Sequence, residues 1–440
     1  MKKSNATLLM ITMIVLMGLS WVLVVKNQIE NNQKYENYIE EAKEFEEKEI
    51  YIDAIASYEK ILKINPEDYD IAVRIAQLYY KMGRYNDYEA ACASAIDIDK
   101  TRPEMYIDEI NYYVNSSKFT EAVKLLKNAE KNVKNSEELN TLATQLSYKC
   151  IEKYVGYEEI KDWHVQSDID YVTVRNKDMY GMTLKDGKIK VKIKFDYLGA
   201  YDKETGVIPC KYEGQWFYVD TGGNKKLVAD VTYDYLGSFG ENYAPAERNG
   251  KYGFINTKFE EKNFEYEYAG AFANGVAAVK KDGRWALINK DMKMITGFDY
   301  DEILMDSYGY CSNYNVIVVK QNGQYIFIDK SGKKLSDNQF DGAKIQASKD
   351  GAIAIMNNGK WGFANQKGEV IIQPQYEDAN SFSMNLAPVK RSGFWGYISD
   401  NNDMVVEAKY NDARPFSEKG AAFVKNGTLW NFIVLCEYDR

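Results

Sequence analysis

The spacing of apolar residues changes twice along this chain of 440 residues. An unbroken apolar run comes first, apolar residues at helical intervals follow, and strand-like alternation begins near residue 160. The pattern predicts a multidomain protein that is α-helical first and then all-β. We expect a membrane anchor and juxtamembrane linker over 1–33, helical repeats over 34–154 and a β-repeat array over 155–440.

The opening run, Thr7–Val25, holds nineteen residues without a charge. As a helix it spans ~28 Å, which is enough to cross the hydrocarbon core of a bilayer. Lys2 and Lys3 precede it, so the positive-inside rule predicts a single-pass protein of the cell membrane with a cytoplasmic N-terminus and an extracytoplasmic bulk. The alternative is a signal peptide cleaved after Gly18 or Ser20, which leaves the apolar stub "WVLVV".

Small and aromatic residues then recur with a period of thirty-four. The recurring positions are Tyr38, Ala42, Phe45, Ala54, Tyr58 and Ile61, then Ala76, Tyr79, Gly83, Cys92 and Ala95, then Tyr106, Ile110, Tyr113, Phe119, Ala122, Leu126 and Ala129. This pattern resembles the tetratricopeptide repeat (TPR), in which helix pairs stack into a solenoid. We predict three TPR-like pairs followed by a capping helix over 136–154, which begins at Ser136.

The resemblance to TPR proteins implies a binding groove. In that family the first helix of each pair lines a concave surface that holds an extended peptide. The corresponding face of this chain carries Lys43, Arg74, Gln77, Tyr80, Asp108 and Asn111. The alternative is a solvated helix face in a domain that serves as a spacer or a dimerisation arm.

A second repeat occupies residues 160–440 and is marked by an aromatic anchor in each copy. The anchors are Tyr180, Trp216, Tyr252, Trp285, Tyr325, Trp361, Trp395 and Trp430, spaced by 36, 36, 33, 40, 36, 34 and 35 residues. A glycine stands two residues before the anchor in six copies: Gly214, Gly250, Gly283, Gly323, Gly359 and Gly393. A second aromatic follows about fifteen residues later, usually with Asp, Glu or Asn directly after it.

Each copy predicts three strands. In the seventh copy "LAPVK" is a strand, "RSG" a tight turn that requires glycine, and "FWGYIS" the return strand. Both faces of the return strand are apolar, so each small sheet must stack against its neighbours. We expect the anchor aromatics to be structural, and the small residue after them, such as Gly362 or Gly396, to let the next sheet approach closely.

The pattern resembles the bacterial WG-repeat (KWG-type) family, named for the pair found here as Trp361-Gly362 and Trp395-Gly396. Earlier copies are looser: Tyr180 and Tyr252 replace Trp, and Phe217 replaces Gly. Members of the family are often surface or envelope proteins joined to other modules. The resemblance therefore implies an extracytoplasmic binding module.

Eight sheets in series close into a propeller-like ring or run as an open β superhelix. The last copy stops without a third strand, whereas "DIDYVTVRN" before Tyr180 supplies extra strand-like sequence. Donation of this segment to the last sheet would close the array and remove its exposed edges. We therefore favour the ring, with the superhelix as the alternative.

Composition narrows the chemistry. The chain has 65 acidic and 56 basic residues, a net charge of −9, which argues against a nucleic-acid partner. The five cysteines, Cys92, Cys150, Cys210, Cys311 and Cys436, are too scattered for a zinc knuckle, and we interpret them as small buried hydrophobes. His164 is the only histidine, and we interpret it as an ordinary partly buried residue.

No phosphate loop, nucleotide-binding glycine fingerprint, EF-hand loop or HExxH motif is present in the sequence. We therefore expect no catalytic residue, no metal and no cofactor. The predicted function is that of a membrane-anchored, extracytoplasmic, non-enzymatic scaffold that binds a protein or peptide through its TPR and WG repeats. The alternative is a binder of cell-wall polysaccharide, including a glycoside hydrolase accessory, which needs exposed aromatic rings on one surface.

Overall fold

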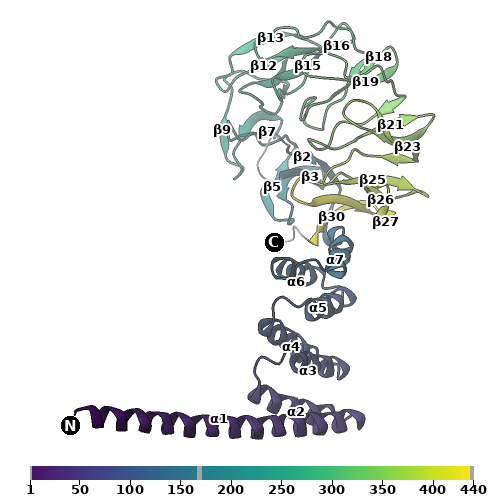
Figure 1. The fold of residues 1–440 in the computed structure, drawn as a ribbon. Helices are drawn as coiled ribbons and strands as arrows, with labels where there is room; N and C mark the ends of the chain where they lie inside the picture. The colour runs from purple at the N-terminus through teal and green to yellow at the C-terminus, as the bar shows by residue number, and fades with distance from the viewer. Residues whose placement is uncertain (1, 166–170, 437–440) are drawn as a thin grey trace. The chain divides into compact units, whose positions relative to one another are not determined.

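The computed structural model describes residues 2–165 and 171–436, and in the first helix the side chains of Met17 and of most residues from Trp21 onward. The chain divides into two compact units, Met1–Ser147 and Tyr148–Arg440. The first unit is helical and the second is built of strands (Figure 1). The α-then-β order that the sequence predicts is confirmed.

The helical unit contains seven helices within the described residues. They are α1 (Lys2–Glu47), α2 (Tyr51–Ile64), α3 (Tyr69–Lys81), α4 (Tyr85–Ile98), α5 (Glu104–Asn115), α6 (Phe119–Asn132) and α7 (Glu137–Ser147). Helix α1 runs through 46 residues without a break. The linker predicted after the anchor is therefore helical, because residues 26–47 contain neither Gly nor Pro to end the helix.

The predicted anchor, Thr7–Val25, falls largely on residues whose side chains lie outside the described set. Among the residues that were described, no helix combines the length and the apolar character needed to cross a membrane. The anchor therefore remains a prediction from the sequence.

Three helix pairs stack in the helical unit: the end of α1 with α2, α3 with α4, and α5 with α6 (Figure 1). The alanines of the repeat pattern, such as Ala42, Ala76 and Ala122, have no exposed surface, because paired helices touch at these points. Helix α7 packs on α6, and the Ser136 hydroxyl accepts a hydrogen bond from the Leu139 amide at 3.3 Å.

The predicted capping helix is correct at its start and too long at its end. Helix α7 ends at Ser147, and the next residues form strand β1 (Cys150–Tyr157) instead of continuing to 154. The reason is tertiary: "CIEKY" finds a strand partner in the ring, and this pairing overrides local helix propensity.

The strands described for the second unit form eight sheets that follow one another around a ring (Figure 1). The predicted closed ring, an eight-bladed β-propeller, is confirmed. Blade 1 contains β2 (Glu159–Trp163), β3 (Tyr171–Asn176), β4 (Met179–Leu184) and β5 (Ile189–Phe195). Blade 2 contains β6 (Tyr197–Leu198), β7 (Ile208–Tyr212), β8 (Gln215–Val219) and β9 (Lys225–Leu227). Blade 3 contains β10 (Tyr235–Leu236), β11 (Ala244–Arg248), β12 (Lys251–Ile255) and β13 (Glu261–Tyr266).

Blades 4 and 5 have three strands each among the described residues: β14 (Tyr268–Ala269), β15 (Val276–Lys281) and β16 (Arg284–Asn289), then β17 (Glu302–Ile303), β18 (Ile317–Gln321) and β19 (Gln324–Ile328). Blade 6 contains β20 (Gly342–Ala343), β21 (Ile353–Asn357), β22 (Lys360–Ala364) and β23 (Val370–Tyr376). Blade 7 contains β24 (Asp378–Ala379), β25 (Leu386–Arg391), β26 (Phe394–Ser399) and β27 (Met404–Tyr410). Blade 8 joins β28 (Asp412–Ala413), β29 (Ala421–Asn426) and β30 (Leu429–Leu435) to β1.

Closure of the ring uses a different segment from the one predicted. Strand β1 pairs antiparallel with β30, with Cys150 opposite Leu435 and Tyr157 opposite Trp430. The predicted donor "DIDYVTVRN" instead supplies β3 of blade 1, which pairs with β2 and β4. The ring is therefore closed by the strand that directly follows the helical unit in the chain.

The prediction of three strands per copy missed the innermost strand. From blade 2 to blade 8 this strand has only two residues, so it is too short to produce a period-two pattern in the sequence. Its hydrogen bonds to the next strand complete each blade on the side of the ring's centre.

The glycine after the anchor aromatic makes room for the outermost strand of its own blade. A Cβ at Gly362 would lie 2.4 Å from the Ile372 carbonyl oxygen, and one at Gly396 would lie 2.4 Å from the Val406 carbonyl oxygen. The outermost strand bulges against the glycine at this point. The predicted role in approach of the next sheet is therefore wrong.

Blades without this glycine lack a long outermost strand of their own. Phe217 accompanies the three-residue β9, and Ala286 and Ile326 accompany the three-stranded blades 4 and 5. In blade 8 the position is Asn431, whose Oδ1 accepts hydrogen bonds from the amides of Val155 (2.9 Å) and Gly156 (3.1 Å) in β1. The asparagine thus binds the bulge that closes the ring.

The hairpin turns confirm the need for glycine before the anchor. The six predicted glycines have φ between +71° and +83°, which a residue with a side chain rarely adopts. The acidic or amide residue after the second aromatic accepts a hydrogen bond from the backbone N–H of the turn in the following blade. These pairs are Asp196–Gly214, Asp234–Asn249, Glu267–Gly283, Asp301–Gly323, Asp341–Asn358, Glu377–Gly393 and Asn411–Gly427.

Candidate functional site at the centre of the ring

One repeat position lies next to the centre of the ring and differs in side chain from blade to blade. In blade 1 it is the residue after Ile160 in β2, and in each later blade it is the residue after the two-residue inner strand. We call it the ring-centre position. In blade order it is Lys161, Gly199, Gly237, Gly270, Leu304, Lys344, Asn380 and Arg414. Blades 2 to 4 therefore present glycine, whereas blades 1, 6, 7 and 8 present long polar side chains. At this repeat position, therefore, the long polar side chains all come from one side of the ring.

The glycine side is filled by an insertion between β17 and β18. This segment accounts for the longest anchor spacing, the 40 residues from Trp285 to Tyr325. Its Tyr310 hydroxyl donates to the Phe239 carbonyl oxygen at 2.7 Å, and its Tyr308 hydroxyl donates to the Asp162 carbonyl oxygen at 2.9 Å. Both tyrosines are buried, so the insertion plugs this half of the ring.

His164 is part of the same packing. Its Nδ1 accepts a hydrogen bond from the Tyr201 amide at 3.2 Å, and its Nε2 lies 2.8 Å from the Tyr308 hydroxyl. Complete burial, with a smaller contribution from Lys161, lowers its pKa to about 3. The imidazole is therefore neutral, with both nitrogens in use, as in an ordinary buried histidine.

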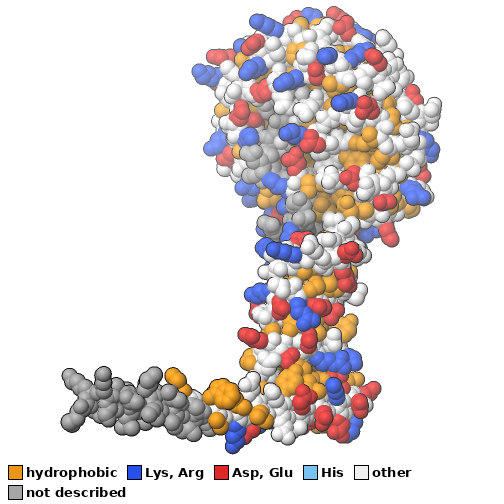
Figure 2. Space-filling view, in the orientation of Figure 1, with side chains coloured by type: hydrophobic (Ala, Val, Ile, Leu, Met, Phe, Trp, Pro, Cys, Tyr) orange, Lys and Arg blue, Asp and Glu red, His pale blue; other side chains and the backbone are white. Residues whose placement is uncertain are grey.

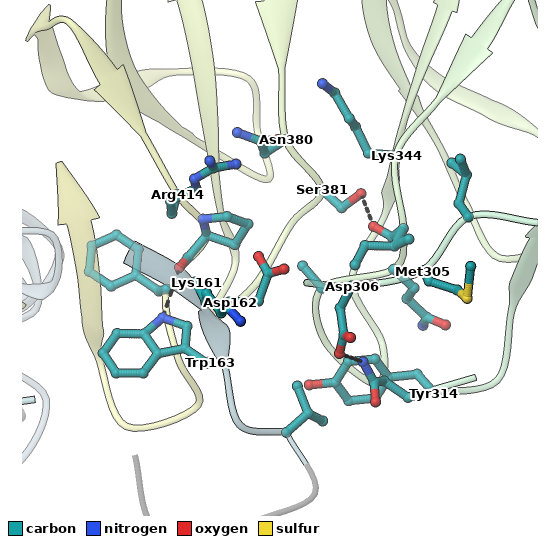
Figure 3. Close-up of a pocket in the computed structure, with 18 of the residues that line it drawn as sticks. Lys161, Asp162, Trp163, Met305, Asp306, Tyr314, Lys344, Asn380, Ser381 and Arg414 are labelled. Carbon is teal, nitrogen blue, oxygen red and sulfur yellow. Dashed lines mark hydrogen bonds between the residues drawn. The ribbon is translucent and has the colours of Figure 1, made fainter. Parts of the chain in front are cut away.

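The other half of the centre contains a cavity of about 320 Å³ (Figure 3). Five blades line it, namely 1, 5, 6, 7 and 8. The lining residues are Lys161, Asp162, Trp163, Val165, Leu304, Met305, Asp306, Asn313, Tyr314, Ala343, Lys344, Ile345, Gln346, Ala347, Asn380, Ser381, Arg414, Pro415, Phe416 and Phe423. Its volume is at the lower end of the ~300–1,000 Å³ typical of small-ligand sites.

Polar side chains reach the cavity from blades 6, 7 and 8. In Figure 3, Lys344, Asn380 and Arg414 lie along one side. The Lys344 ammonium is 3.6 Å from Asp378, and the Asn380 amide donates to the Ala413 carbonyl oxygen at 2.9 Å. The Arg414 guanidinium lies 5.3 Å from the centre of the Trp430 ring and has no carboxylate partner among the described residues.

Two carboxylates provide the acidic side of the cavity. Asp306 accepts hydrogen bonds from the Tyr308 and Tyr310 amides and from the Asn313 side chain, so both of its oxygens are in use. Burial, helped by the Asp162 charge, raises the pKa of Asp306 to about 7. Among the described residues, the Ser307 amide donates a hydrogen bond to the Asp162 carboxylate at 2.8 Å, and this carboxylate points into the cavity in Figure 3.

An aromatic wall completes the cavity. The Trp163 ring stacks on Phe423 with ring centres 4.8 Å apart, and its indole N–H donates to the Pro415 carbonyl oxygen at 3.3 Å. This hydrogen bond joins residues 252 positions apart in the sequence and fixes blade 8 against blade 1. The indole is thus held in place at both its face and its nitrogen.

None of these cavity residues was among the predicted site residues. The sequence predicted neither the inner strands nor their order, so it could not show which side chains meet at the centre. Two signals were present nonetheless. The 40-residue spacing marked the insertion, and the exchange of Gly for Lys, Asn or Arg at one repeat position marked the open half.

The predicted TPR groove residues lie in two environments. Arg74 pairs with the carboxylate of Glu46 from α1 and donates to the Gln77 side chain at 3.2 Å. The Tyr58 hydroxyl donates to the same carboxylate at 2.7 Å. Arg74 and Gln77 are therefore brought together by Glu46, while Lys43 and Asp108 are exposed and Asn111 is half-buried.

Tyr80, another predicted groove residue, belongs to a tyrosine cluster of α3, α4 and α5 that we define as Tyr80, Tyr85, Tyr88, Tyr112 and Tyr113. Tyr88 and Tyr112 are buried, whereas Tyr80 and Tyr85 are 46% and 48% exposed. Tyr88 replaces the small residue expected here, because its ring fills the space beside Tyr112 at 5.2 Å. The groove residues themselves remain a prediction.

The eight predicted anchor aromatics lie within the blades. Trp395 and Trp430 are buried, and the other six are half-buried. Most of the second aromatics lie opposite their anchors, as Tyr376 does for Trp361. The cations at the ring-centre position cover three anchors: Lys161 covers Tyr180, Lys344 covers Trp361 and Arg414 covers Trp430.

In blades 2 to 4, tyrosines of the inner strands cover the anchors instead. Tyr197, Tyr235 and Tyr268 form a continuous arc with Trp216, Tyr252 and Trp285. The planes of contacting rings in this arc are tilted by 34° to 73°. The rings therefore pack against one another and do not form a flat platform.

The cysteines do not provide a nucleophile. Cys92, Cys210, Cys311 and Cys436 are buried, Cys150 is half-buried, and all five are free thiols, so their interpretation as small hydrophobes is confirmed for the four buried ones. Burial raises the pKa of the Cys210 and Cys311 thiols to about 12, which keeps them protonated at neutral pH.

Two family models match the chain. The description "WG containing repeat" matches residues 216–252, 252–285, 285–325, 361–393 and 395–430, and "Tetratricopeptide repeat" matches 51–105. The repeat content predicted from the sequence is confirmed. Together the two kinds of repeat indicate a scaffold for protein–protein interaction. No curated protein matches this chain.

Several solved structures are similar to parts of the chain. The "TPR2B-domain:pHsp70-complex of yeast Sti1" is 24% identical, with 26% of this chain and 94% of that chain covered and a TM-score of 0.22. The MamA protein is 20% identical, with 22% and 54% covered and a TM-score of 0.21. Hsv2 of Kluyvelomyces marxianus is 7% identical, with 62% and 89% covered and a TM-score of 0.38.

Proposed function

We propose that this protein is a membrane-anchored, extracytoplasmic and non-enzymatic scaffold whose TPR unit binds a protein or peptide partner. The observation that carries the proposal is the tyrosine cluster on α3, α4 and α5. Tyr80 and Tyr85 expose about half of their surface while Tyr88 and Tyr112 behind them are buried. Tyrosines are enriched among the residues that dominate binding energy at protein interfaces.

Charge patterning near this face also supports a protein partner. Figure 2 shows hydrophobic side chains on the helical unit between basic and acidic ones. Lys43 is exposed on α1 and Asp108 on α5, so the groove face offers both signs of charge. Such mixed surfaces suit the polar rim of a protein interface.

The non-enzymatic part of the proposal is supported by the state of the reactive groups. His164 has both nitrogens occupied, and Asp306 uses both oxygens within its own loop. The anchor and the extracytoplasmic location are supported by the nineteen uncharged residues Thr7–Val25 and the lysines before them. The polysaccharide alternative is not favoured, because the aromatic arc lacks a flat surface.

Site-specific photocrosslinking in intact cells tests the partner. A photoreactive residue at position 85 should give one defined protein adduct, and Tyr80→Ala should reduce that adduct strongly. A photoreactive residue at position 154, where the tyrosine is 75% exposed in the ring, is the control and should not give the same adduct. Equal adducts from both positions, or an adduct insensitive to Tyr80→Ala, would contradict the proposal.

Protease treatment of intact cells tests the location. Because the lysines precede the apolar run, external protease should digest the ring without lysis. If the ring is cut only after lysis, the orientation is reversed.

A further inference from the structure

The cavity at the centre of the ring combines features that the tyrosine cluster lacks. It is lined by residues from five blades, it has an aromatic wall, and it contains charges of both signs. Its volume of about 320 Å³ suits a small ligand of two or three amino-acid residues. The arrangement of these charges determines which chemical class of ligand can bind.

Three polar side chains at the ring-centre position contact the following blade, whereas, within the part of the chain that the structure describes, the Arg414 side chain does not. Lys161 donates to the Leu198 carbonyl oxygen, Lys344 approaches Asp378, and Asn380 donates to the Ala413 carbonyl oxygen. Each of these residues therefore reaches the innermost strand of the following blade. Arg414 has no such partner among the described residues and instead stacks on Trp430.

The Arg414 guanidinium, which is stacked on Trp430, can bind an anionic group. Its planar N–H groups match a carboxylate with two parallel hydrogen bonds, and stacking on an indole orients the plane. The half-buried position strengthens such a pair relative to one in water. The Arg414 guanidinium, which has no carboxylate partner among the described residues, is therefore suited to bind the carboxylate of a ligand.

The acidic side restricts the ligand further. Asp162 points into the cavity, and its Oδ1 accepts no hydrogen bond from the described residues, whereas both oxygens of the neighbouring Asp306 are in use. The negative charge of the Asp162 carboxylate attracts an ammonium group to this side of the cavity. The Trp163 and Phe416 rings lie in the same lining and provide apolar surface for the part of the ligand between its charges.

We propose that the central cavity binds a short zwitterionic peptide, with its carboxylate on Arg414 and its ammonium group near Asp162. The site is separate from the TPR face, and its occupation does not require the scaffold function proposed above. The aromatic wall accommodates an apolar side chain of the peptide.

Isothermal titration calorimetry with the full-length protein tests this site. The probes are di- and tripeptides with Ala, Leu, Lys or Glu as the variable residue, each in an unblocked form and in forms acetylated at the amine or amidated at the carboxylate. At least one unblocked peptide should bind, and each blocking group should weaken its affinity about ten- to hundredfold, the range expected for the loss of one charged hydrogen-bonded contact.

Variants assign the contacts. Arg414→Ala should weaken the unblocked peptide about ten- to hundredfold but leave the amidated peptide unchanged, because that peptide already lacks the carboxylate. Asp162→Asn should weaken the unblocked peptide by a similar factor but leave the peptide acetylated at the amine unchanged, because that peptide already lacks the ammonium group. The matched controls Arg391→Ala and Asp178→Asn, both at exposed residues of the ring, should bind like the wild type.

Unfolding curves must show that the variants remain folded, and Arg414→Lys provides a milder change that retains the charge. The proposal is overturned if no unblocked peptide binds, if blocked and unblocked peptides bind equally, or if folded Arg414→Ala binds as tightly as the wild type. None of these outcomes depends on whether the TPR unit has a protein partner, so the two proposals fail separately.

Discussion

The solitary histidine is kept neutral by its surroundings. His164 is 4% exposed and fully hydrogen-bonded, and its pKa falls from the ordinary 6.5 to about 3. Its sequence context indicated an ordinary, partly buried residue, whereas the structure buries it almost completely, and its partners Tyr201 and Tyr308 were unpredictable. Tyr308 lies 144 residues away, and no local pattern marks which ring it will enter.

Stability should therefore depend on the protonation of His164. Between pH 3 and 6.5 the unfolded chain binds a proton at this residue and the folded chain does not, so folding stability rises with pH through this window. The slope contributed is at most ~1.4 kcal/mol per pH unit. Denaturant unfolding should show that His164→Gln gains stability relative to the wild type as the pH falls from 7 to 4, because the variant lacks the group that the unfolded wild-type chain protonates.

Asp306 provides the opposite control for that measurement. Its raised pKa means that the folded state binds the extra proton, so its contribution to stability is lost as pH rises towards 7. Asp306→Asn should remove this loss. If His164→Gln leaves the pH dependence unchanged, the histidine is not held neutral in the folded state.

At the scale of the element, the regular parts of a blade were predictable and the irregular parts were not. Hairpin turns and return strands repeat every 33–40 residues, so glycine and aromatic positions revealed them. The outermost segments differ because one residue after the anchor decides their geometry. Gly396 admits a seven-residue strand, whereas Ala286 belongs to a blade whose outer segment is held by two isolated bridges.

Gly396→Ala should destabilise the protein by ~1–3 kcal/mol, because the new methyl group would overlap the backbone of β27. Ala286→Gly is the reverse substitution in a blade without that strand, and it should cost only the ~0.5–1 kcal/mol typical of glycine in a strand. Chemical denaturation of both variants measures the difference. Equal losses would mean that the glycine has no steric role.

The anchor aromatics should differ in how much each contributes to the free energy of unfolding. Trp395 is buried, so Trp395→Ala should lower the free energy of unfolding by ~3–5 kcal/mol. Trp361 is half-buried beneath Lys344, and Trp361→Ala should cost less. Thermal melts and calorimetric titrations of both variants check this. A variant that melts normally but loses a ligand would make its ring a binding residue instead of a core residue.

At the scale of the whole molecule, the sequence allowed us to predict that the ring closes but not which segment closes it. The missing strand of the last repeat indicated that another segment must complete it. The segment that does so, Cys150–Tyr157, follows α7 closely, and its sequence carries no break that separates it from a helix. Its identity depends on a partner strand at the far end of the chain, which a local pattern cannot reveal.

Asn431 should control that closure. Asn431→Ala leaves the amides of the half-buried Val155 and Gly156 without their acceptor, which should cost ~1–3 kcal/mol in total. Hydrogen exchange should accelerate in β1 more than in the other blades. The control Asn401→Ala removes an exposed asparagine from a turn and should leave exchange unchanged. Uniform acceleration across the ring would contradict a local role in closure.

The closing strand also sets the order of events during translation. Strand β1 leaves the ribosome before every other strand of the ring, and the Asn431 side chain that binds it is encoded 276 residues after Val155. At ~5–20 residues per second the nascent chain therefore carries an unpaired strand for roughly 14–55 seconds. Ring closure is consequently a single late event, and any truncated product lacking β30 leaves an open edge at both ends of the array.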